Sequence, residues 1–243
     1  MVGIFQMIKL FKLSLLRGNS DQDYFDFQAY QGKLIVSELM ARGVNLKNKE
    51  ILDLGCGIGG YSSQFYKESR KLTAADINKP KILLKKCPNI NFLKFDACKK
   101  FPLSSKKFDL VVCSSTIEHV CNPLGLLKEI NRVLDDGGRL VLTFPPFYSP
   151  FGGHTFKPFH YLGEKMAIRI NNLIRKQNVK SYSTAYGNWG LYPLKISDVE
   201  NLLKKSGFTI NDKWVRFFPI NIAKIPFLNE LVTWHINFLC EKP

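Results

Sequence analysis

The stretch ILDLGCGIGG, from Ile51 to Gly60, predicts the fold of the chain, and the other predicted elements are arranged around it. The apolar run at its start carries one acid, Asp53, and ends in a glycine-rich turn. A segment compatible with a helix follows from near Tyr61. This order is typical of a buried parallel strand, a tight loop and a helix N-terminus. Glycines let the backbone approach a ligand closely, and the free amides of the helix can bind its polar groups.

Two classes of ligand use such a loop, and Asp53 distinguishes them. Gly55, Gly57 and Gly60 match G-x-G-x-x-G, the fingerprint of dinucleotide-binding folds. A carboxylate two residues before the first glycine would repel a pyrophosphate, whereas it would form a charge-assisted hydrogen bond with an α-amino group. The run D-L-G-C-G-x-G, ending at Gly59, resembles motif I of the class I S-adenosylmethionine-dependent methyltransferases. The resemblance implies S-adenosylmethionine as the cofactor, bound by Asp53, Gly55, Gly57 and Gly59.

Acids that follow the next two predicted strands extend this resemblance. Asp76 ends the second strand, about twenty residues beyond the loop, where an acid can accept both hydroxyls of a ribose. Dinucleotide-binding folds share that contact, so it indicates a nucleoside without choosing between the two classes. Ile77 follows and is placed to pack on the adenine. The run F-D-A-C-K-K-F-P-L after the third strand resembles the segment that binds the adenine amino group, which implies contacts from Asp96 and Ala97.

The fourth predicted strand, at 108–113, is followed by S-S-T-I-E-H-V, which also resembles the family. In the family this strand ends beneath the sulfonium and the methyl acceptor. The resemblance therefore implies that Ser114 contacts the cofactor and that Glu118 and His119 lie near the mouth of the cleft. We take Glu118 and His119 as candidate catalytic residues, with a structural role as the alternative for His119.

The segment 145–194 is a longer connection than a compact fold needs. It contains P-P-F-Y-S-P-F-G-G-H-T-F-K-P-F-H-Y and a predicted helix at 164–176. We predict that it forms a cap that binds the methyl acceptor. His154 and His160 are candidate catalytic residues, because histidines titrate near about pH 6.5 and can accept a proton from a hydroxyl. The alternative is that both histidines order an aromatic loop.

The order of the predicted elements indicates an α/β fold. The resemblance implies a Rossmann-like seven-stranded sheet of order 3-2-1-4-5-7-6, with the last strand antiparallel, helices on both faces and a cap insertion after the fifth strand. Residues 1–48 are predicted to form an N-terminal helical lid, and residues 49–243 the methyltransferase domain. The predicted boundaries in the second half are a helix that ends at Gly137, a fifth strand at 139–144, a helix capped by Ser197 and Glu200, a sixth strand within 208–218 and a half-buried final strand over 232–238.

The charge of the chain suggests a negatively charged partner. Its 35 basic and 20 acidic residues give a net charge of +15. Nucleic acid, an anionic membrane surface and a phosphorylated substrate all fit that balance, and a solvated lysine surface is the alternative. Residues 1–17 are predicted to form an amphipathic helix, which would either contact a membrane surface or pack over the cleft. No uncharged apolar run is long enough to span a bilayer.

The six cysteines include no C-x-x-C pair and show no zinc-ligand spacing. We interpret them as reduced thiols of a cytoplasmic protein. The sequence pattern requires no metal.

The reaction implied by the resemblance is in-line transfer of a methyl group from a sulfonium to a nucleophile. The N-P-P-Y-like tetrad of adenine-N6 enzymes and the Pro-Cys nucleophile of cytosine-C5 enzymes are both absent, because C-S-S-T follows the fourth strand. We therefore expect O-methylation of a small-molecule or glycan acceptor, with a lipid-linked one suggested by the apolar N-terminus and region 217–240. The alternatives are an RNA-directed methyltransferase, a non-catalytic nucleotide-binding module of the same fold and a dinucleotide-dependent oxidoreductase, which Asp53 disfavours.

Overall fold

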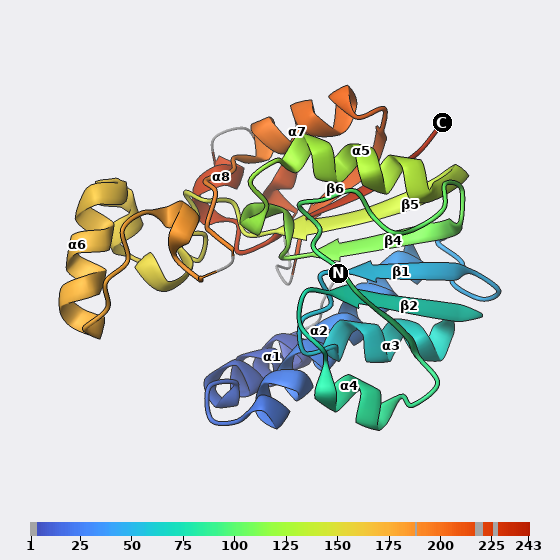
Figure 1. The fold of residues 1–243 in the computed structure, drawn as a ribbon, viewed down its shortest axis with the longest axis horizontal. Helices are drawn as coiled ribbons and strands as arrows, with labels where there is room; N and C mark the ends of the chain where they lie inside the picture. The colour runs from blue at the N-terminus through green and yellow to red at the C-terminus, as the bar shows by residue number, and fades with distance from the viewer. Residues whose placement is uncertain (1–3, 188, 217–220, 226–227) are drawn as a thin grey trace.

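The computed structural model describes residues 4–187, 189–216, 221–225 and 228–243. Seven strands form one sheet, and helices cover both of its faces (Figure 1). The strands are β1 Glu50–Leu54, β2 Lys71–Asp76, β3 Asn91–Lys94, β4 Phe108–Ser114, β5 Leu134–Phe144, β6 Thr209–Val215 and β7 Ile236–Glu241. The α-helices are α1 Ile4–Leu16, α2 Asp21–Ala41, α3 Gly60–Glu68, α4 Lys81–Lys86, α5 Pro123–Val133, α6 Glu164–Arg175, α7 Ile196–Lys205 and α8 Leu228–Val232.

The sheet has the order β3-β2-β1-β4-β5-β7-β6, which confirms the predicted topology. Strands β1 to β5 are parallel, and β7 is antiparallel to both of its neighbours, β5 and β6. The strands β1, β2 and β4 are adjacent and parallel, so their carboxyl ends meet at one edge of the sheet. A ligand-binding crevice is expected at that edge in a fold of this kind.

Two apolar layers enclose the sheet. The helices α5 and α7 pack on one face, and α2, α3 and α4 cover the other (Figure 1). Residue Asn122 begins α5 as predicted, since its side chain accepts a hydrogen bond from the Gly125 amide and Pro123 occupies the first helical position. The segment 145–194 has a small core of its own, made of Phe147, Phe156, Ala167, Ile168, Tyr182 and Leu191.

Four predicted boundaries differ from the structure. The helix α5 ends at Val133 and β5 begins at Leu134, because Gly137 and Gly138 lie within the extended chain. The first residue of α7 is Ile196, and the amide of Lys195 donates to Asp198 where a cap from Ser197 was expected. The polar residues at 18–23 predict a break before a helix that starts at Phe25, whereas α2 begins at Asp21, because Ser20 caps it. The sixth strand is present as β6, while positions 217 and 218 of its predicted range lie outside the described residues.

The fourth difference concerns the last strand. We expected a half-buried strand over 232–238, and the structure has β7 at Ile236–Glu241 with its first five residues all buried. Ile236, Phe238 and Cys240 pack in one apolar layer and Leu239 packs in the other, so both faces of the strand are covered. Alternation of apolar and polar residues is typical of a strand with one solvated face. Searching for that pattern therefore gave the wrong bounds for this strand. Val232, in the same predicted run, is the last residue of α8.

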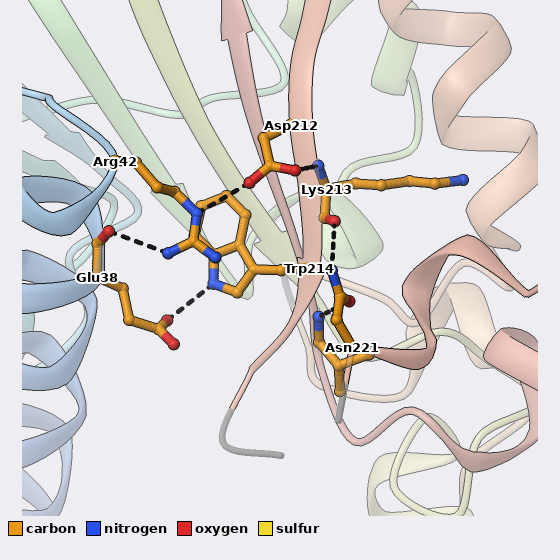
Figure 2. Close-up of polar contacts among 7 residues, drawn as sticks. Glu38, Arg42, Asp212, Lys213, Trp214 and Asn221 are labelled. Carbon is orange, nitrogen blue, oxygen red and sulfur yellow. Dashed lines mark hydrogen bonds and ion pairs between the residues drawn. The ribbon is translucent and has the colours of Figure 1, made fainter. Parts of the chain in front are cut away.

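The N-terminal helices are attached to the sheet through Trp214 of β6 (Figure 2). The indole Nε1 donates to Glu38 Oε2 of α2 at 2.8 Å, and both side chains are buried. The guanidinium of Arg42 lies over the indole ring, 3.7 Å from its centroid, and its Nε donates to Asp212 Oδ2 at 2.9 Å. A buried carboxylate is costly without a donor, so this contact fixes the position of α2 beside the sheet.

We predict that Trp214→Phe lowers the free energy of unfolding by about 1–3 kcal/mol, because it leaves the buried Glu38 carboxylate without its indole donor. Urea unfolding followed by circular dichroism measures the change. The control is Arg70→Met, which breaks an ion pair to Glu50 in which Arg70 is 59% exposed, and it should cost no more than about 1 kcal/mol. Equal losses in the two variants would contradict the role given to Trp214.

Candidate active site

The glycine loop follows β1 and depends on Gly55. Its φ is +74°, and a Cβ at this position would lie 2.2 Å from Thr116 Oγ1, in a loop that follows β4. The amides of Gly55 and Cys56 both donate to the carbonyl of Ala75, at 2.8 and 3.0 Å. The absence of a side chain therefore lets the end of β1 pass between the ends of its two neighbouring strands.

The other glycines of the motif have two different roles. Gly57, with φ +56°, faces open space, and its amide donates to Asp76 Oδ2 at 2.8 Å. A Cβ on Gly59 would lie 2.4 Å from Leu83 of α4, and one on Gly60 would lie 2.4 Å from Gln28 of α2. Gly57 is therefore suited to a ligand, whereas Gly59 and Gly60 allow helices to pack closely on the start of α3.

A cavity of about 670 Å³ lies at the carboxyl edge of the sheet. It brings together seven of the nine predicted cofactor-binding residues, which are Gly55, Gly57, Asp76, Ile77, Asp96, Ala97 and Ser114. Asp76 also accepts the amide of Asn78, and Asp96 accepts the amide of Cys98, so each loop holds its carboxylate in place. The volume is in the range of small-ligand sites. Among the described lining residues Gly59 is absent, in agreement with its packing against Leu83.

A second cavity, of about 440 Å³, adjoins the first. Asp53 lines it, as do many aromatic side chains and three cations. The residues that line both cavities are Tyr24, Gln28, Gly55, Ser114, Ser115, His154 and Trp189. Tyr24 and Gln28 place α2 beside both cavities, whereas Tyr30 of the same helix lies beneath Lys9 of α1. The two cavities meet next to the end of β4.

The carboxyl group of Asp53 is 1% exposed and accepts a hydrogen bond from Ser62 Oγ at 2.5 Å. Its pKa is raised to about 7, chiefly by burial and also by the nearby charge of Asp76, while the bond from Ser62 opposes the change. A carboxyl with this pKa would become an anion when a cationic group enters the cavity.

Glu118, His119 and His154 lie together where the two cavities meet. Glu118 and His119 belong to a short 3-10 helix after β4, and His154 comes from the segment after β5. His154 Nε2 is 3.8 Å from Glu118 Oε1, and the rings of His119 and His154 are edge to face with centroids 4.9 Å apart. Burial raises the pKa of Glu118 to about 8 and lowers the pKa of His154 to about 3. Burial also lowers the pKa of His119, so both imidazoles are neutral near pH 7.

His160 is not part of this group. It is 1% exposed, its Nε2 is 3.2 Å from the Ser149 carbonyl, and its ring packs against Phe147. It lines neither cavity among the described residues. Its ring lies where a Cβ on Gly153 would be, which places it inside the core of the cap. The geometry therefore favours the structural alternative for His160 and a role in the site for His154.

Sequence reasoning missed several residues of the second cavity. Tyr186 and Trp189 stack with centroids 4.5 Å apart, and Phe151 stacks on Trp234 at 4.3 Å. His235 also lines this cavity, and its Nε2 is 3.1 Å from Ser115 Oγ. Their positions depend on how the cap and the end of β7 fold over the crevice, and no short motif encodes that arrangement.

The raised pKa of Asp53 predicts a pH dependence of stability. The folded protein holds this proton up to about pH 7, whereas the unfolded chain releases it near about pH 4. Between these values the folded state binds more protons, so the Asp53 contribution to stability falls as pH rises, by about 1 kcal/mol per pH unit. We expect Asp53→Asn to remove that part of the slope in urea unfolding at several values between pH 5 and 7. Asp109→Asn on β4 is the control, because the pKa of Asp109 is lowered and lies outside this range.

Comparisons with known proteins agree with this geometry. Residues 52–142 match the family described as "Methyltransferase domain". The chain is 28% identical over 205 residues to an uncharacterized methyltransferase of Mycobacteroides abscessus, covering 79% of this chain and 76% of that protein. It is also 28% identical over 176 residues to a ubiquinone/menaquinone biosynthesis C-methyltransferase of Haemophilus ducreyi, covering 67% of this chain and 65% of that protein.

A solved S-adenosylmethionine-dependent methyltransferase of Clostridium acetobutylicum has the same fold, with a TM-score of 0.60 and 15% identity, and the likeness covers 87% of this chain and 90% of that one. The matched range 52–142 begins within the glycine-loop stretch and ends in β5, so it spans β1 to β4 and the loops that line the larger cavity. The glycine motif alone fitted both a dinucleotide-binding protein and a methyltransferase, and the comparisons favour the methyltransferase. Residues 52–142 therefore form a methyltransferase domain, and the fold around them is that of the S-adenosylmethionine-dependent methyltransferases.

Proposed function

We propose that the protein methylates a hydroxyl of a small-molecule or glycan acceptor that carries an anionic group, such as a lipid-linked phosphorylated glycan. The observation that carries this proposal is the second cavity, which adjoins the cofactor cavity and combines aromatic walls with three cations. In the same assignment, Asp53, Gly55, Gly57, Asp76, Ile77, Asp96, Ala97 and Ser114 hold S-adenosylmethionine, and the segment 145–194 is the acceptor-binding cap.

Arg17, Lys157 and Arg175 line the second cavity from three different parts of the chain. Burial lowers the pKa of Lys157, and the charges of Arg17 and Arg175 lower it further. Three cations that repel one another favour an anionic guest, because its charge would relieve the repulsion. A phosphate or carboxylate on the acceptor supplies that charge.

The aromatic side chains of the cavity suit the rest of such an acceptor. Tyr186, Trp189, Phe151 and Trp234 present two stacked pairs, and large rings offer an apolar face next to a polar edge. A sugar ring has the same combination of apolar face and polar rim. The volume of about 440 Å³ fits one small acceptor group.

His154 and Ser114 line both cavities, so they mark the place where an acceptor hydroxyl would meet the methyl group. Transfer forms an O–CH₃ bond and breaks the S–CH₃ bond, whose electron pair stays on sulfur and leaves a neutral thioether. Positioning of the two reactants supplies most of the catalysis in such a reaction. His154 is therefore the candidate catalytic residue that lies nearest to the place where the two reactants would meet.

Helix α1 gives the proposal a membrane component. One face of α1 packs on α2 through Leu10, while the exposed residues of the helix include Phe5, Phe11 and Leu15, which are 84, 61 and 66% exposed. Lys9 and Lys12 make the same helix basic. Amphipathic helices of this kind bind the surface of anionic membranes. In this proposal the helix packs on α2 through one face and contacts a membrane through its exposed residues.

The helices α1 and α6 lie at the end of the molecule where the parallel strands finish (Figure 1). Helix α6 exposes Leu173 and Ile174, which are 82 and 64% exposed. Among the described helices, none is long and apolar enough to cross a membrane. All six cysteines are free. We therefore propose a cytoplasmic location at the membrane surface, where a lipid-linked acceptor would enter the second cavity between α1 and the cap.

The experiment that tests the acceptor class uses S-adenosylmethionine with a radioactive methyl group. The purified protein is incubated with three fractions: lipid-extractable glycans, water-soluble small molecules and RNA. We expect label in one of the first two fractions, and loss of that label in Asp76→Ala, because the variant removes a carboxylate from the cofactor cavity. Label confined to RNA would instead favour the basic surface as a nucleic-acid site.

The membrane contact is tested by flotation with vesicles that contain an anionic lipid. We expect the Phe5→Glu/Phe11→Glu double variant to reduce binding at least about tenfold, because it places two charges on the apolar face. Met40→Glu is the control, since Met40 is a 43% exposed apolar residue at the end of α2. Unchanged binding in the double variant, or equal binding to neutral vesicles, would show that α1 does not bind anionic membranes.

A further inference from the structure

Three side chains at the junction of the cavities have the chemistry of a metal site. Glu118, His119 and His154 each offer one ligand atom, and these atoms lie within 4.8 Å of one another. Glu118 is 2% exposed, and within the described part of the chain neither of its carboxylate oxygens has a hydrogen-bond partner. His154 Nε2 is buried and equally lacks a hydrogen bond among those residues. Buried polar atoms without partners are costly, so the unsatisfied atoms of Glu118 and His154, next to His119, indicate a ligand between the three side chains.

His154 reaches Glu118 through an unfavourable backbone conformation. His154 has a φ of +49°, a left-handed conformation that is unfavourable for a residue with a side chain. It follows Gly152 and Gly153, which have no room for a Cβ: each would lie within 2.3 Å of neighbouring atoms. The turn that carries His154 is therefore closely packed and holds the imidazole against Glu118. Strain of this kind is common where a side chain must be held in one place.

His119 is oriented as metal-binding histidines are. Its Nδ1 donates to the carbonyl of Gly190 at 2.7 Å, and that bond fixes the tautomer in which Nε2 carries a lone pair. The rings of Trp189 and Tyr186 pack against the imidazole, with centroids 4.5 and 5.7 Å away. These contacts hold the ring in position before any ion arrives.

We propose that Glu118, His119 and His154 bind one divalent first-row transition-metal ion. Two imidazoles and a carboxylate form a ligand set for zinc, manganese, iron or cobalt rather than for magnesium, which prefers oxygen ligands alone. Bonds of about 2.1 Å to a tetrahedral ion place ligand atoms about 3.4 Å apart. The distance of 3.8 Å between His154 Nε2 and Glu118 Oε1 therefore needs only a small inward movement of the side chains.

The location of the site gives the ion a task in methyl transfer. His154 lines both cavities and His119 lines the larger one, so the coordination positions left open face the junction. An acceptor hydroxyl that binds the ion would lose its proton to water more readily, because the cation stabilises the oxygen anion. The oxygen would then attack the methyl carbon, and the C–S electron pair would pass to sulfur. This task rests on the proposed function, whereas binding of the ion does not.

The test is metal binding to the full-length protein in the absence of any acceptor. Cys98 and Cys121 are exposed and close enough to hydrogen-bond, so they could bind metal themselves. The measurement therefore uses a Cys98→Ser/Cys121→Ser background, treated with a chelator and titrated with Co²⁺ by calorimetry and absorption spectroscopy. We expect one Co²⁺ per chain, visible absorption of a nitrogen and oxygen site without a thiolate band, and no binding of Mg²⁺.

Glu118→Gln and His154→Asn should each weaken Co²⁺ binding by at least about 100-fold, because each removes a direct ligand. His160→Asn is the matched control, since this histidine lies in the same cap but outside both cavities. The Co²⁺ affinity of this variant should equal that of the Cys98→Ser/Cys121→Ser background. Binding of S-adenosylmethionine and circular dichroism verify that each variant is folded. Absence of Co²⁺ and Zn²⁺ binding at about 100 µM in the folded background, or equal binding in Glu118→Gln and His154→Asn, would overturn the proposal. Failure of all acceptor fractions with metal binding intact would count against the proposed function alone.

Discussion

The whole site depends on a close approach of three strand ends at Gly55. The amides of Gly55 and Cys56 both bond to Ala75 at the end of β2, while Thr116 fills the space that a Cβ on Gly55 would need. The amide of Gly57 then bonds to Asp76, so the loop after β1 and the acid after β2 hold one another. A larger side chain at Gly55 would separate β1 from the loop after β4. The cofactor cavity and the group around Glu118 both lie on that junction, so both would be lost together.

The sequence predicted the sheet and most of the cofactor cavity because these depend on local rules. A buried parallel strand, a glycine turn and a carboxylate at a strand end are each encoded within ten or so residues, and the parallel topology then brings the strand ends together. Asp76 was found in this way, whereas Asp96 and Ser114 were implied by the resemblance to the methyltransferase family. The prediction failed for β7, because an apolar layer covers each of its faces and leaves no alternation of apolar and polar residues to detect.

The acceptor side could be predicted only in outline. The unusual length of segment 145–194 indicated a cap, yet nothing in the order of its residues distinguished His154 from His160. The structure separates them through backbone conformation, since a positive φ turns His154 toward Glu118 while His160 packs inside the cap. The same limit applies to metal ligands. Glu118 and His119 are adjacent in sequence, but His154 is far along the chain, so no spacing motif of the kind used for zinc sites exists.

The distribution of charge offers an account of the large positive net charge that needs no nucleic acid. Two acids lie where the cofactor is expected, since Asp76 and Asp96 line the larger cavity, while Asp53 lines the second cavity beside the glycine loop. Cations gather on the other side of the junction, at Arg17, Lys157 and Arg175. A sulfonium cofactor and an anionic acceptor would each be attracted to its own cavity and repelled from the other, so the two reactants would enter from opposite sides and meet at Ser114 and His154. The basic N-terminal helix next to the acceptor cavity extends this separation to the surface, where it would favour an anionic membrane.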